Sequence, residues 1–148
     1  MWFAYMDEAG NTGRNLTDAS QTIHLILTLV VDESQVPVLH DHVRTVGHRH
    51  CQPHCLAPDF EFHGHALFGG NGYFSGMSPV KRVEIYTDLL EGIQLVGGRT
   101  VVRGVFKPGL HARYERPFHP HDIALMFTIE SVERMAKAEG SRVLLGSG

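Results

Sequence analysis

The chain lacks the features that mark membrane and secreted proteins. Its longest apolar run, Leu25 to Val31, is interrupted by Thr28 and stays well below the roughly 20 residues of a membrane span. The N-terminus has no basic start, apolar stretch and small-residue cleavage site, because Asp7 and Glu8 follow the first few residues. We therefore expect a cytoplasmic protein without a membrane partner.

Strong charge, many cysteines and nucleotide-binding motifs are absent as well. The net charge of −3 argues against coating of nucleic acid through bulk charge, so any contact with phosphates has to be local or bridged by a metal. The only two cysteines, Cys51 and Cys55, are expected to be reduced thiols in a cytosolic chain. A Walker loop, a dinucleotide fingerprint and a Gly-x-Ser-x-Gly elbow are missing, which disfavours nucleoside triphosphate use and serine hydrolysis.

The pattern that is present is typical of an α/β fold. A length of 148 residues with 43% hydrophobic content suits one core, so we expect a single domain over residues 1–148. The predicted strands cover residues 2–6, 22–31, 100–106 and 142–145, with a strand-like piece over 60–65, and the predicted helices cover 34–50, 78–97 and 119–140. This order predicts a mixed β-sheet flanked by helices that begins with a hairpin, and it is compatible with a ribonuclease H-like layout.

Apolar spacing also predicts which surfaces are buried. Strand 22–31 is almost wholly apolar, which favours coverage on both of its faces. The apolar faces expected of the last two helices are Val83, Tyr86, Leu90 and Ile93, and then Leu125, Met126, Ile129, Val132 and Ala136.

Asp7 is the strongest candidate for chemistry. It stands at the carboxyl end of the first strand, where α/β sheets bind ligands, in the segment Asp7-Glu8-Ala9-Gly10-Asn11. Glu8 alternates to the opposite face of that strand. In the competing interpretation Asp7 and Asn11 only close the turn by binding backbone amides, and the sequence leaves both open.

A second candidate pair is Glu61 and His63. In Phe60-Glu61-Phe62-His63 aromatic and polar residues alternate, so a strand would place Glu61 and His63 on one face, where they could share a divalent metal or a water. The alternative is a solvated edge strand with its aromatic face inward.

Asp122 is a third candidate carboxylate, at the start of the last helix. Its spacing puts it on the apolar side of that helix, pointing toward the sheet. We favour a structural role, because acidic residues in the first turn interact well with the helix dipole. His119 and His121 nearby are weaker candidates. Carboxylates from separate segments are what two-metal phosphoryl chemistry needs, since Mg2+ and Mn2+ take oxygen ligands.

The cysteine-containing segment offers a possible zinc site. Cys51, His54 and Cys55 have a spacing within the loose range seen for zinc. No second cysteine pair exists elsewhere, so this is the weaker alternative.

Two motifs in order give the chain a family resemblance. Tyr5-Met6-Asp7-Glu8-Ala9-Gly10-Asn11 near the start and Glu61-Phe62-His63-Gly64 in the middle precede a last helix that leads into Arg142-Val143-Leu144-Leu145. With these motifs the chain resembles the bacterial and phage family known as domain of unknown function 3800, over nearly its whole length.

The resemblance implies a ribonuclease H-like fold and a metal-dependent nuclease, or a protein of phage defence or mobile elements. It implies that Asp7 and Glu61 are metal ligands for Mg2+ or Mn2+, with Glu8, Asn11 and His63 as neighbours in the site. His63 would assist proton transfer, and nucleic acid would be the partner.

One departure from the family pattern concerns the end of the chain. The family's last strand typically runs into an aspartate and a glutamate, whereas this sequence has Gly146-Ser147-Gly148. Three explanations compete: a domain truncated at its C-terminus, a variant that has lost catalysis and serves as an interaction module, or a substitute ligand such as Asp122.

Overall fold

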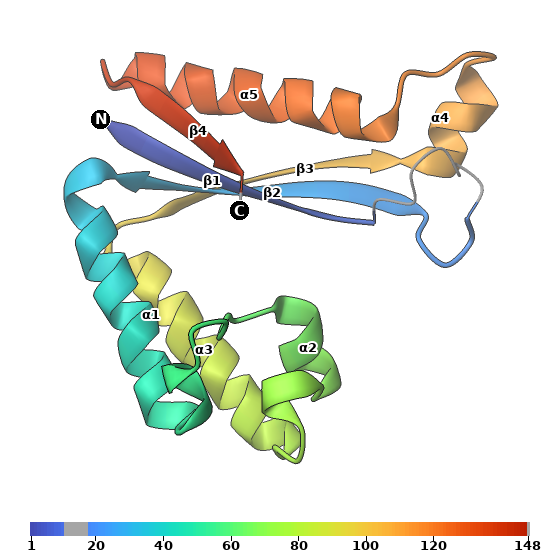
Figure 1. Cartoon of the computed structure of the whole chain (residues 1–148). Helices are drawn as coiled ribbons and strands as arrows, with labels where there is room; N and C mark the ends of the chain where they lie inside the picture. The colour runs from blue at the N-terminus through green and yellow to red at the C-terminus, as the bar shows by residue number, and fades with distance from the viewer. Residues whose placement is uncertain (11–17, 148) are drawn as a thin grey trace. The chain divides into compact units, whose positions relative to one another are not determined.

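The structure is a computed structural model that describes residues 1–10 and 18–147 (Figure 1). It divides into two compact units, which we call the sheet unit (Met1–Glu33 with Gly98–Gly148) and the helical unit (Ser34–Gly97). The single-domain expectation stays a prediction, because compactness alone does not decide which parts fold together.

A four-stranded mixed sheet forms the centre of the sheet unit. Its strands are β1 (Trp2–Ala9), β2 (Ile23–Asp32), β3 (Arg99–Phe106) and β4 (Val143–Ser147), in the order β3-β2-β1-β4. Strand β2 is antiparallel to both β1 and β3, whereas β4 is parallel to β1. The predicted α/β class, the mixed sheet and the initial hairpin are confirmed.

The long helix α5 (Pro120–Ala138) packs against one face of this sheet. Small residues on α5 allow the close approach, and the core that results consists of Trp2, Ala4, Val30, Val101, Val132 and Ala136. The expected apolar stripe of α5 is partly wrong, because Met126 is 50% exposed and Ile129 is 38% exposed while Ala124 and Thr128 are buried. The side chains that fit between helix and sheet are small, and spacing of large hydrophobic residues alone does not identify them.

Strand β2 alternates between a buried and an exposed face. His24, Ile26, Thr28 and Val30 are buried, whereas Ile23, Leu25 and Leu27 are at least 38% exposed. The expectation of coverage on both faces is therefore wrong for most of the strand, because α5 packs only on the face that carries His24, although Val31 near its end is buried as well.

The segment after β3 continues into a helix that the sequence analysis missed, α4 (Lys107–Arg113). Pro108 fits there because the first turn of a helix needs no amide hydrogen from it. The side chain of Lys107, the first residue of α4, is buried.

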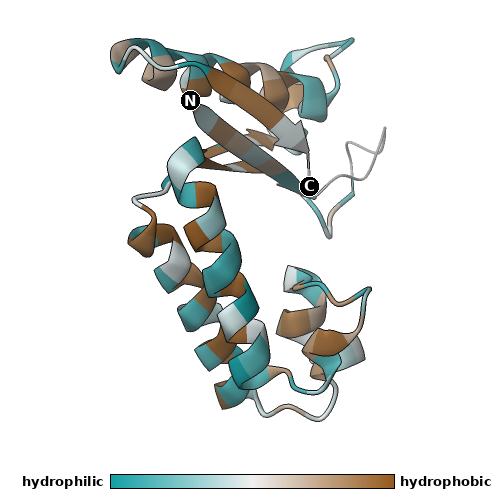
Figure 2. Ribbon diagram, turned by 60° about the vertical axis from the view of Figure 1, so that its left-hand side comes forward, coloured by the Kyte–Doolittle hydropathy of each residue, from teal (hydrophilic) through white to brown (hydrophobic). Residues whose placement is uncertain are grey.

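The helical unit is built on the amphipathic helices α1 (Val36–His50) and α3 (Pro79–Leu95), whose hydrophilic and hydrophobic residues are interspersed in Figure 2. The hydroxyl of Ser78 caps α3 by accepting a hydrogen bond from the Lys81 amide at 3.2 Å. Both helices were predicted. The short helix α2 (Gly64–Gly69) and the 3-10 turns η1 (Glu33–Gln35), η2 (His54–Leu56) and η3 (Gly72–Phe74) complete the order of elements.

The predicted apolar face of α3 is partly wrong. Two of its residues, Tyr86 and Ile93, are partly buried, and Tyr86 packs against the core of this unit, whereas the other two residues do not. Val83 and Leu90 are about 60% exposed, whereas Ile85 and Gly92 are buried. A Cβ atom at Gly92 would lie 2.6 Å from the His42 ring of α1, so the absence of a side chain there lets the two helices approach. As on α5, the helix packs closely at a small residue, and the spacing of large hydrophobic residues does not identify that position.

Candidate metal centre

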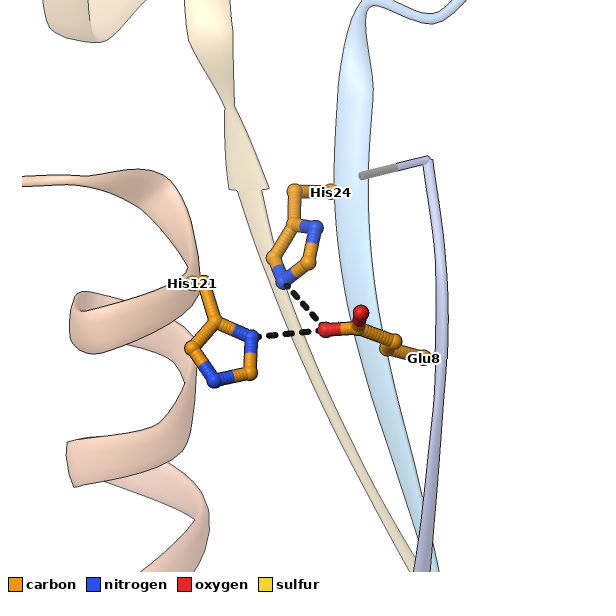
Figure 3. Close-up of side chains that lie close together, drawn as sticks. All are labelled: Glu8, His24 and His121. Carbon is orange, nitrogen blue, oxygen red and sulfur yellow. Dashed lines mark hydrogen bonds and ion pairs between the residues drawn. The ribbon is translucent and has the colours of Figure 1, made fainter. Parts of the chain in front are cut away.

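Three side chains from three elements of the sheet unit point toward one another (Figure 3). They are Glu8 near the end of β1, His24 near the start of β2 and His121 in the first turn of α5. The Glu8 carboxylate oxygen Oε2 lies 2.7 Å from His121 Nδ1 and 3.9 Å from His24 Nε2. The three candidate ligand atoms all lie within 4.8 Å of one another.

Strand register brings Glu8 and His24 to the same place. Glu8 is paired with Ile26 across the β1–β2 hairpin, and His24, two residues before Ile26, emerges on the same face. This is the face that α5 covers, so the first turn of α5 delivers His121 to both side chains. His119, the residue before α5, fixes this first turn. Its side chain caps the helix by accepting a hydrogen bond from the His121 amide at 3.3 Å.

Burial favours the neutral form of the His24 imidazole. Burial lowers its pKa, and the nearby Glu8 carboxylate opposes this only in part. One ring nitrogen of His24 is hydrogen-bonded to the Gly10 carbonyl oxygen, whereas Nε2 has no hydrogen-bond partner among the described residues. The bond to Gly10 therefore falls on Nδ1, which donates its proton, and the lone pair of Nε2 points toward Glu8.

These residues fit a metal ion. A buried polar atom without a partner is costly, and a cation at the lone pair of His24 Nε2 would satisfy it. Neutral imidazole and carboxylate are the protonation states that bind metals. In the hydrogen bond between His121 and the Glu8 carboxylate the imidazole Nδ1 donates, so an ion bound at this nitrogen would require the other tautomer, with the proton on Nε2.

One side of the Glu8, His24 and His121 cluster faces solvent, so that a water or a substrate could reach a bound ion there. The side chains of Glu8 and His121 are 38% and 36% exposed, whereas that of His24 is 2% exposed. A centre with three protein ligands and an open side is typical of catalytic rather than structural metal sites.

Asp7 lies on the opposite face of β1 from this cluster. It is exposed, it is paired with Leu27, and its own Oδ1 accepts a hydrogen bond from the Glu8 amide at 2.8 Å. Of the two neighbouring carboxylates, the structure brings Glu8 rather than Asp7 together with the histidines. The predicted neighbour Asn11 lies outside the described residues.

Glu61 and His63 lie together in the helical unit. Their side chains are exposed, with Glu61 Oε2 3.2 Å from His63 Nε2, while Phe60 and Phe62 pack against the core of this unit. The predicted alternation of faces is confirmed, but the strand is wrong, because residues 60–63 have no regular secondary structure and the helix α2 begins at Gly64. Asp7 belongs to the sheet unit, so a shared ion between Asp7 and Glu61 stays a prediction.

Asp122 does not point into the sheet. It is exposed in the first turn of α5, and its neighbour His121 takes the inward position. The predicted orientation of Asp122 is wrong by about one helical position. The inward side chain is that of His121, which the sequence had indicated only as a weaker candidate.

The cysteine segment contains a Cys-His contact but no larger group of metal ligands among the described residues. Cys51 is fully buried, and burial raises the pKa of its thiol. Cys55 Sγ lies 3.8 Å from His48 Nδ1, and the His54 ring packs against Tyr73. The hypothesis of zinc at Cys51, His54 and Cys55 gains no third ligand from this arrangement.

Sequence reasoning missed His24 and underrated His121. A histidine at an inward position of an otherwise apolar strand was the available signal for His24, since neutral burial of an imidazole needs a partner. For His121 the signal was its place within the first turn after the His119-Pro120 helix start.

Comparisons with known proteins give no assignment for the chain. No described helix has both the length and the apolar character that crossing a membrane requires. Protein-family models, curated proteins and solved structures yield no significant match to this sequence.

Proposed function

We propose that this protein is a divalent-metal-dependent nuclease whose ion is held by Glu8, His24 and His121. The observation that carries the proposal is the convergence of one carboxylate and two imidazoles, with all candidate ligand atoms within 4.8 Å of one another. The open side of this cluster would admit a phosphodiester. The reaction type itself comes from the resemblance to the domain of unknown function 3800 family.

The proposal includes a ribonuclease H-like fold for the sheet unit. Its support is the strand order β3-β2-β1-β4, with three antiparallel strands followed by a helix and a strand parallel to β1. The cluster at the carboxyl end of β1 is also where ligands bind in sheets of this class.

Each residue would have a distinct part in the chemistry. A divalent ion supplies Lewis acidity and lowers the pKa of a bound water, which is what phosphodiester hydrolysis at neutral pH requires. His24 would bind through Nε2, with its orientation set by the Gly10 carbonyl. Glu8 would contribute negative charge between the two imidazoles, and the half-exposed His121 would face the substrate side.

The experiment is a cleavage assay with Mn2+ on labelled single- and double-stranded DNA and RNA. We expect Glu8→Gln and His121→Gln each to lower the cleavage rate by on the order of 100-fold or more, since loss of mere outer-shell partners of a metal costs roughly 10- to 100-fold. Glu130→Gln on α5 is the matched control, because Glu130 is an exposed glutamate of the same helix.

Two further variants separate the predicted sites. Loss of cleavage in Asp7→Asn and Glu61→Gln, with Glu8→Gln unaffected, would assign the ion to the residues that the family resemblance implies. Metal binding without cleavage of any substrate would contradict the nuclease proposal and favour an interaction module.

The donor set supports one second candidate. Two histidines and one carboxylate with open positions also hold Fe2+ in non-haem oxygenases. Oxygen consumption by the Fe2+-loaded protein, in the presence of 2-oxo acids as trial co-substrates, is the measurement that would favour this reading over hydrolysis.

A further inference from the structure

We infer that the cluster of Glu8, His24 and His121 selects a transition-metal ion over Mg2+, and that Lys107 is a positioning residue that presets His24 for this ion. The inference uses the metal site of the proposed function, but it does not depend on which reaction that site performs. It concerns metal choice and the second layer of residues around the ligands.

The first element of the arrangement is Gly10, which follows β1 directly. Its φ angle is +78°, and a Cβ atom there would lie 2.0 Å from the Ile23 carbonyl oxygen. Only glycine fits this position, so the direction of the Gly10 carbonyl is set by a left-handed backbone conformation packed against the start of β2.

The second element is the buried ammonium of Lys107. This side chain is 1% exposed, and Nζ donates a hydrogen bond to the Gly10 carbonyl oxygen at 3.1 Å. The Lys107 amide also donates to the Thr22 carbonyl oxygen at 2.9 Å, which fixes the start of α4 against the start of β2. Lysine is rarely buried unless its charge is paired, and the Asp18 carboxylate supplies an opposite charge for Lys107.

Both elements meet at one oxygen atom. The Gly10 carbonyl oxygen has two lone pairs: it accepts from Lys107 Nζ, and it is also the backbone partner of the His24 imidazole, which we assign to Nδ1 because Nε2 has no hydrogen-bond partner in the described part of the chain. Metal-binding histidines commonly donate their second ring proton to a backbone carbonyl, which fixes the tautomer and the ring orientation. Here that donation leaves the Nε2 lone pair free toward Glu8 and His121, and Lys107 keeps the accepting carbonyl in place.

The donor atoms then decide the metal. Imidazole nitrogen suits Zn2+, Fe2+, Co2+ and related ions, whereas Mg2+ prefers an octahedral shell of oxygen atoms and keeps its water. Two nitrogen donors and one carboxylate oxygen therefore favour Fe2+, Co2+ or Zn2+, with Mn2+ the weakest binder of this series. Among the first expectations for the cofactor, this inference retains Mn2+ and disfavours Mg2+.

The test of metal choice is a titration of the metal-free full chain with Co2+, followed by its visible absorption bands. We expect one Co2+ per chain and loss of the absorption bands in Glu8→Gln. Because Mg2+ prefers oxygen ligands, an excess of about 100 Mg2+ per Co2+ should not displace the bound Co2+. Displacement of Co2+ by Mg2+, or unchanged bands in Glu8→Gln, would overturn the inference.

The test of Lys107 uses Lys107→Met, with the exposed Lys137→Met on α5 as matched control. We expect Lys107→Met to weaken Co2+ binding roughly 10- to 100-fold, the range for outer-shell partners. Lys107→Gln, which retains a donor without the charge, should recover part of the affinity. Full affinity in Lys107→Met would overturn the positioning role.

A second readout does not depend on the metal. Long-range 1H–15N spectra of the metal-free protein should show His24 with its proton on Nδ1, and this assignment should weaken in Lys107→Met but not in Lys137→Met. A proton on Nε2 in the wild-type chain would contradict the inference even if a variant failed to fold. Co2+ binding without nuclease activity would leave it intact and remove only the proposed reaction.

Discussion

At the scale of single residues, Gly10 fixes the backbone beside the candidate metal centre. We expect Gly10→Ala to lower the free energy of unfolding by at least about 1–3 kcal/mol, the cost of one strained backbone position, because of its φ of +78° and the clash with the Ile23 carbonyl. Chemical denaturation would measure this loss. Gly146→Ala is the control, since a Cβ atom there meets nothing within 4 Å, and an equal loss in both variants would contradict the explanation.

At the scale of elements, Asp88 connects α3 to α1. Its carboxylate oxygen Oδ2 accepts hydrogen bonds from His50 Nε2 at 2.6 Å and from Arg49 Nη1 at 2.9 Å, and its main-chain oxygen accepts from His42 Nε2 at 2.6 Å. The hydrogen bond from His50 is the main reason why the pKa of Asp88 is lowered from its usual value. Three contacts on one residue therefore hold the two long helices of the helical unit together.

The lowered pKa has a definite effect on stability against pH. A carboxyl group with a depressed pKa in the folded state stabilises the fold above its unfolded pKa, roughly 4, and loses this contribution as the pH falls through the folded value. We expect Asp88→Asn to lower the Tm at pH 7 and to reduce the loss of stability below about pH 4. Asp41→Asn, which removes an exposed carboxylate of α1, should change neither, and thermal melts across this pH range would decide.

At the scale of the whole chain, the helical unit is inserted between two paired strands. Strands β2 and β3 are antiparallel neighbours, with Val30 opposite Arg99, so their ends on either side of Ser34–Gly97 lie close enough for a hairpin. Two strands in this relation need only a turn of about two to five residues. The helical unit is therefore not needed to close the sheet.

This topology gives a prediction for a shortened protein. We expect replacement of Ser34–Gly97 by a short Asn-Gly turn to leave the sheet unit folded and able to bind Co2+, because Glu8, His24 and His121 all belong to that unit. Circular dichroism and the Co2+ titration would check this, with Glu8→Gln in the same background as control. A shortened chain that unfolds would show that the sheet depends on the helical unit.

Local pattern was sufficient for most of the elements of this fold. Apolar runs, the Ser78-Pro79 and His119-Pro120 helix starts and the glycines that follow these two helices locate most strands and long helices to within a few residues, because periodicity and capping act over short distances. The same alternation placed Asp7 and Glu8 on opposite faces of β1. Short helices such as α4 were missed, since proline and glycine near a strand end also suit a turn.

The partners of Glu8 were decided only by the tertiary structure. His24 and His121 are 97 residues apart, and they meet Glu8 because the hairpin register sets one face of β2 and the small residues of α5 let its first turn approach that face. No periodicity in the chain encodes this contact, since it depends on strand pairing and on which helix covers which face. The sequence by itself determined where acidic and imidazole groups stand along the elements, and packing determined which of them share a site.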